Sequence, residues 1–160
     1  MQWKERITGM TYNLTILPSG SEEITEMSVA LHHDLELRYG KGSIEDFIEE
    51  NGEMLIFYAV QNGDNGFTAC GALKHFNGET AEIKRMYVKD EHRGQGLSKL
   101  ILRELEETAA GMNYKRIILE TGTKQPEAMN LYEKSGYTKI KAYGRHKDDP
   151  DSVCYEKIIR

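Results

Sequence analysis

Cysteine is scarce in this sequence. The 160-residue chain has only two cysteines, Cys70 and Cys154, which stand far apart without a C-x-x-C spacing. A disulfide framework and a zinc site are therefore disfavoured, and a cysteine nucleophile lacks a motif with a nearby histidine. The adjacent His32, His33 and Asp34 do not supply a metal site, because neighbouring positions on a helix point apart. We expect two buried, reduced cysteines and no metal.

Long apolar runs and an excess of positive charge are also missing. No segment approaches the roughly 18 apolar residues of a membrane span, and the N-terminal "MQWKERITGM" lacks the apolar core of a signal peptide. Lys and Arg number 21 against 26 Asp and Glu, a formal net charge of −5. Binding to nucleic acid depends on neutralising phosphates, so this balance argues against it. We expect a cytoplasmic protein with neither a membrane nor a nucleic acid as partner.

The composition is that of an ordinary globular protein. Hydrophobic residues make up 39% and charged residues 29% of the chain, and there are no internal repeats or low-complexity tracts. A length of 160 residues supports one sizeable core and is short for two. We therefore expect a single domain over residues 1–160.

The first half of the chain predicts one strand, two helices and an antiparallel meander. Ile24, Met27, Leu31 and Leu35 recur at helical spacing, and the turn "QNGDNG" between two β-type runs is a strong hairpin signal. The capping-box sequence "SIED" predicts the short second helix. In order, the predicted elements are a strand over 11–17, helices over 19–40 and 43–50, and strands over 53–60, 67–76 and 80–88.

The second half predicts a parallel strand pair joined by a helix. The helix after residue 96 has one apolar stripe, and the run "RIILE" over 116–120 is typical of a strand buried on both faces. Strands 80–88 and 116–120 should then be parallel, with a right-handed crossover between them. The remaining predicted elements are a helix from Pro126 to Gly136 and strands over 137–143 and 152–159. This order predicts an α/β fold with a mixed sheet.

A glycine-spaced loop connects strand 80–88 to the following helix. Gly94 and Gly96 let the backbone approach a ligand closely, and the N–H groups and dipole of a helix N-terminus attract anions, above all phosphates. The spacing fits neither the dinucleotide fingerprint nor the P-loop, which disfavours a generic nucleotide binder. From the loop alone, a phosphate site and an ordinary glycine-rich turn both remain open.

Two longer stretches resemble the GNAT superfamily of acyl-CoA-dependent N-acyltransferases. They are "EIKRMYVKDEHRGQGLSKLILRELE" and "ILETGTKQPEAMNLYEKSGY", which lie within residues 80–143. The first contains the family pattern Q/R-x-x-G-x-G/A from Arg93 to Ser98, with serine where glycine or alanine is usual. The second matches N-x-x-A-x-x-L-Y-x-x-x-G-F/Y at Ala128, Leu131, Tyr132, Gly136 and Tyr137, with Gln125 in the asparagine position.

This resemblance implies the fold and the acyl donor. The fold would be a single-domain GNAT-like fold with a mixed, mostly antiparallel sheet of six to seven strands, about four helices and a parallel central βαβ unit. The donor would be acetyl-CoA, which Gln125 and Ala128 would also contact, Gln125 at the pantetheine arm. The loop residues whose N–H groups would wrap the pyrophosphate are Arg93, Gly94, Gln95, Gly96, Leu97 and Ser98. The Arg93 side chain would either add charge near the phosphates or lie solvated.

The resemblance also implies how the thioester is activated. Backbone at a strand bulge over Met86, Tyr87 and Val88 would polarise the thioester carbonyl. An N–H aimed at the developing oxyanion stabilises it most where water is scarce. Tyr132 would act as the general acid that protonates the leaving thiolate.

The general base and the acceptor stay open. Glu82 or Glu120 would take the proton of the amine, directly or through water, unless each is a solvated or ion-paired surface group. By the resemblance, the N-terminal helices and the turn over 144–151 frame the acceptor. These segments contain the acids Glu22, Glu23, Glu26, Asp34, Glu36, Asp148, Asp149 and Asp151. Such acids favour a cationic acceptor, or serve only as solubility charge.

The sequence therefore predicts an N-acetyltransferase that moves an acetyl group from acetyl-CoA directly to a primary amine of a small molecule or peptide. The alternative is a non-catalytic GNAT-like module that binds or senses an acyl-CoA. Release of the CoA thiol with an amine would separate the two. The oligomeric state stays open between a monomer and a homodimer.

Overall fold

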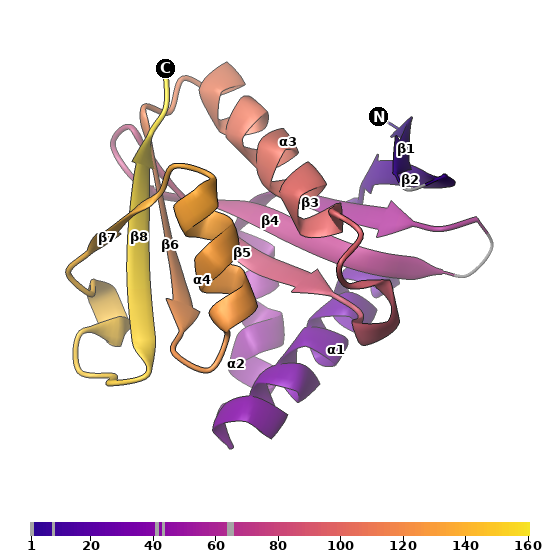
Figure 1. The fold of residues 1–160 in the computed structure, drawn as a ribbon. Helices are drawn as coiled ribbons and strands as arrows, with labels where there is room; N and C mark the ends of the chain where they lie inside the picture. The colour runs from indigo at the N-terminus through magenta and orange to yellow at the C-terminus, as the bar shows by residue number, and fades with distance from the viewer. Residues whose placement is uncertain (1, 8, 41, 43, 64–65) are drawn as a thin grey trace.

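The computed structural model describes residues 2–7, 9–40, 42, 44–63 and 66–160, which form one eight-stranded sheet with helices on both faces (Figure 1). The strand order is β1-β2-β3-β4-β5-β6-β8-β7. The strands are β1 Gln2–Ile7, β2 Met10–Ile16, β3 Met54–Gln61, β4 Phe67–Asn77, β5 Thr80–Val88, β6 Arg116–Gly122, β7 Thr138–Ile140 and β8 Ser152–Ile158. The helices are α1 Glu22–Tyr39, α2 Ile44–Glu49, α3 Leu97–Gly111 and α4 Pro126–Lys134, with 3-10 segments η1 Glu50–Glu53, η2 Asp90–His92 and η3 Gly144–His146.

The sheet is mixed, as predicted. Strands β5 and β6 pair in parallel, from Thr80 opposite Arg116 to Ile83 opposite Leu119, and α3 connects them. The other strand pairs between described residues are antiparallel. The predicted α/β GNAT-like fold with a central parallel βαβ unit is therefore confirmed.

Helices cover the sheet on both faces. On one face, Ile101 and Leu105 of α3 and Tyr132 of α4 belong to a buried cluster with residues of the central strands. On the other face, Ile24 and Met27 of α1 join a second buried cluster. Figure 1 shows α3 and α4 in front of the sheet and α1 and α2 behind it. Burial of these apolar side chains is the main force that holds the helices to the sheet.

The two edges of the sheet differ from the sequence prediction. Strand β1 was not predicted, which is why the sheet has eight strands rather than six or seven. Its sequence "QWKERI" has no apolar alternation, and its pairing to β2 follows a tight turn that contains Gly9. At the other edge, β7 ends at Ile140 instead of 143. The chain leaves the edge there, because Tyr143 packs against Phe76, with ring centroids 5.3 Å apart.

Two irregularities of β5 create space in the middle of the sheet. Pairing with β6 ends at Ile83, although β5 continues to Val88. On the β4 side, Arg85 and Met86 together lie opposite Gly71, which is a β-bulge, and Arg85 has a φ of 60°. A Cβ at Gly71 would lie 2.5 Å from Ile101 and 2.7 Å from Met86 Sδ, so only glycine fits beneath α3 here. The strands β5 and β6 therefore part after Ile83, just before the bulge.

Some predicted features lie outside the described residues. They are Ser43, the predicted cap of the second helix, and Asp64 and Asn65 of the hairpin turn. The helix itself is present as α2, and it continues into η1.

Candidate active site

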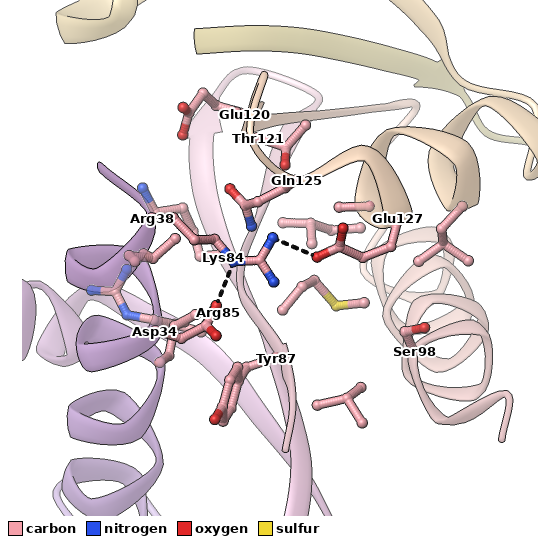
Figure 2. A pocket seen from close by; sticks show the side chains of 18 of the residues that line it. Asp34, Arg38, Lys84, Arg85, Tyr87, Ser98, Glu120, Thr121, Gln125 and Glu127 are labelled. Carbon is pink, nitrogen blue, oxygen red and sulfur yellow. Dashed lines mark hydrogen bonds and ion pairs between the residues drawn. The ribbon is translucent and has the colours of Figure 1, made fainter. Parts of the chain in front are cut away.

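A cavity of about 590 Å³ lies where β5 and β6 part. Its lining comes from α1, Gly42, Phe47 of α2, the second half of β5 with the glycine loop, the end of β6, α4 with Gln125 before it, and the segment from η3 to the start of β8. Figure 2 shows side chains of α1 and of the β6–α4 segment facing each other across it. Every predicted site residue except Gln95 lines this cavity.

The glycine loop meets the cavity at the N-terminus of α3. Gly94 and Gly96 have φ values of 75° and 83°, a left-handed conformation that favours glycine. Gly96 is the N-cap of α3 and supplies no side chain to the first turn, so N–H groups of that turn keep their capacity for an anion. The Gln95 side chain points away from the cavity lining, since its oxygen accepts a hydrogen bond from Tyr12 on β2, and its backbone N–H remains a predicted donor.

The partly exposed Arg93 side chain contacts three parts of the chain. Its Nε donates to the carbonyl of Val88 at 2.9 Å, which fixes the loop to the end of β5. Its two terminal nitrogens lie 3.3 Å from Asp34 and 2.7 Å from Asp90. Arg93 therefore connects the loop to α1, and most of its charge is already compensated.

The C-terminal end of α1 is bonded to the start of α4. Arg38 lies 3.0 Å from Asp34 and 2.7 Å from Glu127, the two contacts drawn as dashed lines in Figure 2. Tyr39 donates to Gln125 Oε1 at 3.2 Å and accepts the N–H of Lys124 at 3.1 Å. Because Tyr39 occupies the carboxamide oxygen of Gln125, the amide nitrogen of that side chain is left for a ligand in the cavity.

Tyr132 lies at the inner end of the cavity. The side chain is only 4% exposed, and its ring packs against Tyr137 and Tyr155 at centroid distances of 5.7 and 6.0 Å. Burial, assisted by the Glu120 carboxylate, raises the pKa of Tyr132 well above its usual value of 10.0. The hydroxyl is therefore protonated at neutral pH.

Glu120, at the end of β6, has the properties of a base near neutral pH. Burial raises its pKa from 4.5 to about 7, although the hydrogen bond from Ser152 to Oε1, 3.0 Å long, opposes this shift. His146 Nε2 lies 3.9 Å from Oε2. Burial, with Lys84 and Arg145 nearby, lowers the pKa of His146, so its ring is neutral at pH 7 and can relay a proton.

Glu82, the other predicted base, is held in an ion pair. Its side chain is 8% exposed, and its Oε1 lies 3.3 Å from Lys84 Nζ. Lys84 also contacts Glu50 at 3.1 Å. Burial alone would raise the pKa of Glu50, but Lys84, Arg85 and Arg145 hold it at about 2. The Glu82 alternative therefore agrees with the ion-paired interpretation better than with a base.

Two predictions about the site need correction. The bulge lies at Arg85 and Met86, one residue earlier than predicted, because the register with β4 shifts between Ala72 and Cys70. Of the eight predicted acids, only Asp34, Asp149 and Asp151 line the cavity, and Asp34 is paired with arginines. The negative potential expected for a cationic acceptor is thus largely compensated.

Sequence reasoning missed several lining residues. Tyr39, Lys84, Arg145, His146 and Ser152 all face the cavity, but none belongs to a motif that sequence reading would single out. The polar turn over 144–151 was noted as part of the acceptor side, yet nothing in it marked His146. Its contact with Glu120 joins segments that only the folded sheet brings together.

Three further expectations concern the cysteines, metal binding and membrane-spanning helices. Cys70 and Cys154 are both free and buried, as predicted, and burial raises the pKa of the Cys70 thiol to about 12. Within the described residues, no group of three or more His, Cys, Asp or Glu side chains is arranged to hold a metal ion. The described helices include none with the length and apolarity to cross a membrane.

Comparison with known proteins assigns the family. Residues 20–137 match the family described as "Acetyltransferase (GNAT) family". The "Uncharacterized N-acetyltransferase YsnE" of Bacillus subtilis (strain 168) is 32% identical over 110 residues, which are 68% of this chain and 72% of that protein. A crystal structure from Klebsiella pneumoniae, assigned as an acyl-CoA N-acyltransferase, aligns with a TM-score of 0.77 and 27% identity over 93% of this chain and 98% of the other.

A further structure shares the fold. The PaiA N-acetyltransferase of Thermoplasma acidophilum, in complex with coenzyme A, aligns with a TM-score of 0.70 and 19% identity over 93% of this chain and 99% of the other. Together these likenesses define the class of protein as an acyltransferase enzyme. The chain belongs to the GNAT family of acetyltransferases, whose members use acetyl-CoA as co-substrate.

Proposed function

We propose that this protein transfers the acetyl group of acetyl-CoA directly to a primary amine, with both substrates bound at once. The observation that carries the proposal is that one cavity is lined by a glycine loop at the N-terminus of α3, a buried tyrosine and a carboxylate with a pKa of about 7. In this proposal residues 1–160 act as one catalytic domain.

The donor would enter between the parted strands. Its pyrophosphate would accept hydrogen bonds from backbone N–H groups over 93–98, where α3 begins. The pantetheine arm would run between β5 and α4, in reach of the Gln125 amide nitrogen that Tyr39 orients. Fixing the thioester beside the amine gives a large effective molarity, which is the main source of the proposed rate enhancement.

Glu120 would prepare the nucleophile. An amine arrives protonated at neutral pH, and a carboxylate with a pKa of about 7 can remove that proton at the operating pH. His146 would pass the proton on toward solvent, since its neutral ring lies 3.9 Å from the carboxylate. The free amine then attacks the carbonyl carbon of the thioester.

Backbone and tyrosine would complete the transfer. N–H groups of β5 beyond the bulge lose their β6 partner and can stabilise the oxyanion that forms on the carbonyl. When the C–S bond breaks, Tyr132 gives its proton to the departing thiolate, so that the products are an N-acetyl amine and the free CoA thiol. The acetylated nitrogen loses its second proton to the Glu120 and His146 pair, and a proton from solvent restores the Tyr132 hydroxyl.

A thiol-release assay tests the proposal. Purified protein with acetyl-CoA is offered amino acids, polyamines, aminoglycosides and peptides, and the products are identified by mass spectrometry. We expect CoA release that depends on an amine and yields an N-acetyl product. If acetyl-CoA raises the melting temperature while no amine causes release, the protein is an acyl-CoA binding or sensing module and the proposal is wrong.

A further inference from the structure

A second cavity, of about 430 Å³, adjoins the first on the acceptor side. Its lining comes from α2, η1, β4 and η3, and the residues that line both cavities are Glu82, Lys84, Arg145 and His146. We call these four residues the shared wall. An acceptor whose amine reaches Glu120 would extend past this wall into the second cavity.

Most charges near the shared wall are already compensated. Lys84 is 12% exposed and lies between Glu50 at 3.1 Å and Glu82 at 3.3 Å. Glu50 also contacts the buried Arg85 at 3.3 Å. On the outer side of the second cavity, Glu53 lies 2.5 Å from Lys74. These groups have little charge left for a ligand.

Arg145 is the exception in the shared wall. Its side chain is 66% exposed, and within the described residues its guanidinium has one ion pair, a contact of 3.4 Å with Glu50. Glu50 is shared with Lys74, Lys84 and Arg85, so it compensates only part of the Arg145 charge. A guanidinium has five N–H donors in a fork that matches a carboxylate. Most of those donors are available to a ligand at the boundary of the two cavities.

We propose that the acceptor has a carboxylate close to its amine, as in an amino acid, and that Arg145 binds that carboxylate. This inference rests on the proposed acetyl transfer. The amine faces Glu120 and His146, and the carboxylate takes the donors of Arg145. A zwitterion adds one charge of each sign and so suits a wall with a base on one side and a partly compensated guanidinium on the other.

Matched acceptors test the inference. With acetyl-CoA fixed, kcat and KM are measured for each of the common L-amino acids, for its amide and for its decarboxylated amine. A hydrogen bond to a charged partner of about 1.5–3 kcal/mol corresponds to about 10- to 100-fold in affinity. We expect that the preferred amino acid exceeds both analogues by about that factor in kcat/KM.

The variant Arg145→Gln tests whether the carboxylate preference comes from a direct contact with Arg145 or from the overall positive charge. It should raise KM for the amino acid until the preference over the amide disappears, so that kcat/KM falls much more for the amino acid than for the amide. Arg145→Lys should retain part of the preference. Lys141→Gln removes the same charge from an exposed position outside both cavities and should leave the preference intact.

Three results would overturn the inference. Amides or decarboxylated amines used as well as the amino acids would show that no carboxylate is bound. Acetylation confined to peptide N-termini would exclude an acceptor with its carboxylate beside the amine. If no amine of any kind causes release of CoA, the proposed acetyl transfer itself is wrong. The first two results would leave acetyl transfer intact.

Discussion

Burial and a hydrogen bond shift the pKa of the Glu120 carboxyl group in opposite directions. Burial raises its pKa from 4.5 to about 7, and the bond from Ser152 limits the rise. A carboxyl group accepts a proton only when ionised, so kcat/KM should rise with pH and level off above about 7. A pH–rate profile for the free enzyme measures this.

Two variants assign that inflection to Glu120. Glu120→Gln should lower kcat/KM by roughly 10²- to 10⁴-fold and remove the inflection near neutral pH, leaving only the ionisation of the acceptor amine. Ser152→Ala removes a hydrogen bond to the ionised form, so the inflection should move to higher pH. An unchanged inflection in Glu120→Gln would transfer the role to His146 or to water.

Tyr132 tests the other end of the proton path. Tyr132→Phe keeps the ring between Tyr137 and Tyr155 and removes only the hydroxyl, so the fold and the affinity for acetyl-CoA should hardly change. Turnover should fall by roughly 10²- to 10⁴-fold, the range of general acid catalysis. Steady-state kinetics beside the melting-temperature shift with acetyl-CoA separates the two effects. Wild-type turnover would mean that water protonates the thiolate.

At the scale of elements, α1 is bonded to the β6–α4 segment through a close approach at Gly122. A methyl group at this position would overlap the Tyr39 hydroxyl and lie 2.5 Å from its Cζ. Gly122→Ala should therefore displace Tyr39, break its bonds to Gln125 and Lys124, and destabilise the fold by about 1–3 kcal/mol. The KM for acetyl-CoA should rise as well, since Gln125 loses its orientation.

A double-mutant cycle in denaturant measures this coupling. Tyr39→Ala removes the side chain that the new methyl group would meet. The double variant Tyr39→Ala with Gly122→Ala should be less destabilised than the sum of the two single changes. Additive losses would show that Tyr39 and Gly122 do not restrict each other.

The glycine loop makes a second prediction at this scale. Gly96→Val places a branched side chain at a φ of 83° and against the proposed pyrophosphate site, so the melting-temperature increase caused by acetyl-CoA should disappear. Gly20→Val is the matched control, because Gly20 has a φ of 76° and lies outside the cavity. Both variants carry backbone strain, but only Gly20→Val should keep the shift. A normal shift in Gly96→Val would remove the loop from the donor site.

At the scale of the whole molecule, the parting of β5 and β6 creates the site. The parallel strand pair and the helix between them were predicted from hydrophobic periodicity. The run "RIILE" and the leucine stripe of α3 are local patterns that indicate which residues are buried. The loop and Tyr132 followed from motifs. The parting itself did not, since it depends on where the pairing of β5 with β6 stops. The bulge was implied only by the family resemblance, which placed it one residue later than the structure does.

The missing parts of the prediction have the same physical origin. Strand β1 has no apolar alternation, so only its hydrogen bonds to β2 reveal it. The Glu120 and His146 pair joins β6 to a turn more than twenty residues away. The charge of Arg145 is only partly compensated because Lys74, Lys84 and Arg85 also pair with Glu50. Tertiary contacts between distant segments set these features, and local sequence does not encode them.

Initial-rate kinetics with both substrates varied tests direct transfer in the cavity most directly. Direct attack of the amine on the thioester requires both substrates to be bound together, so double-reciprocal plots should intersect and the intact protein should keep its mass after incubation with acetyl-CoA alone. Parallel plots, together with a protein that gains an acetyl group in the absence of amine, would reveal a covalent intermediate and contradict direct transfer.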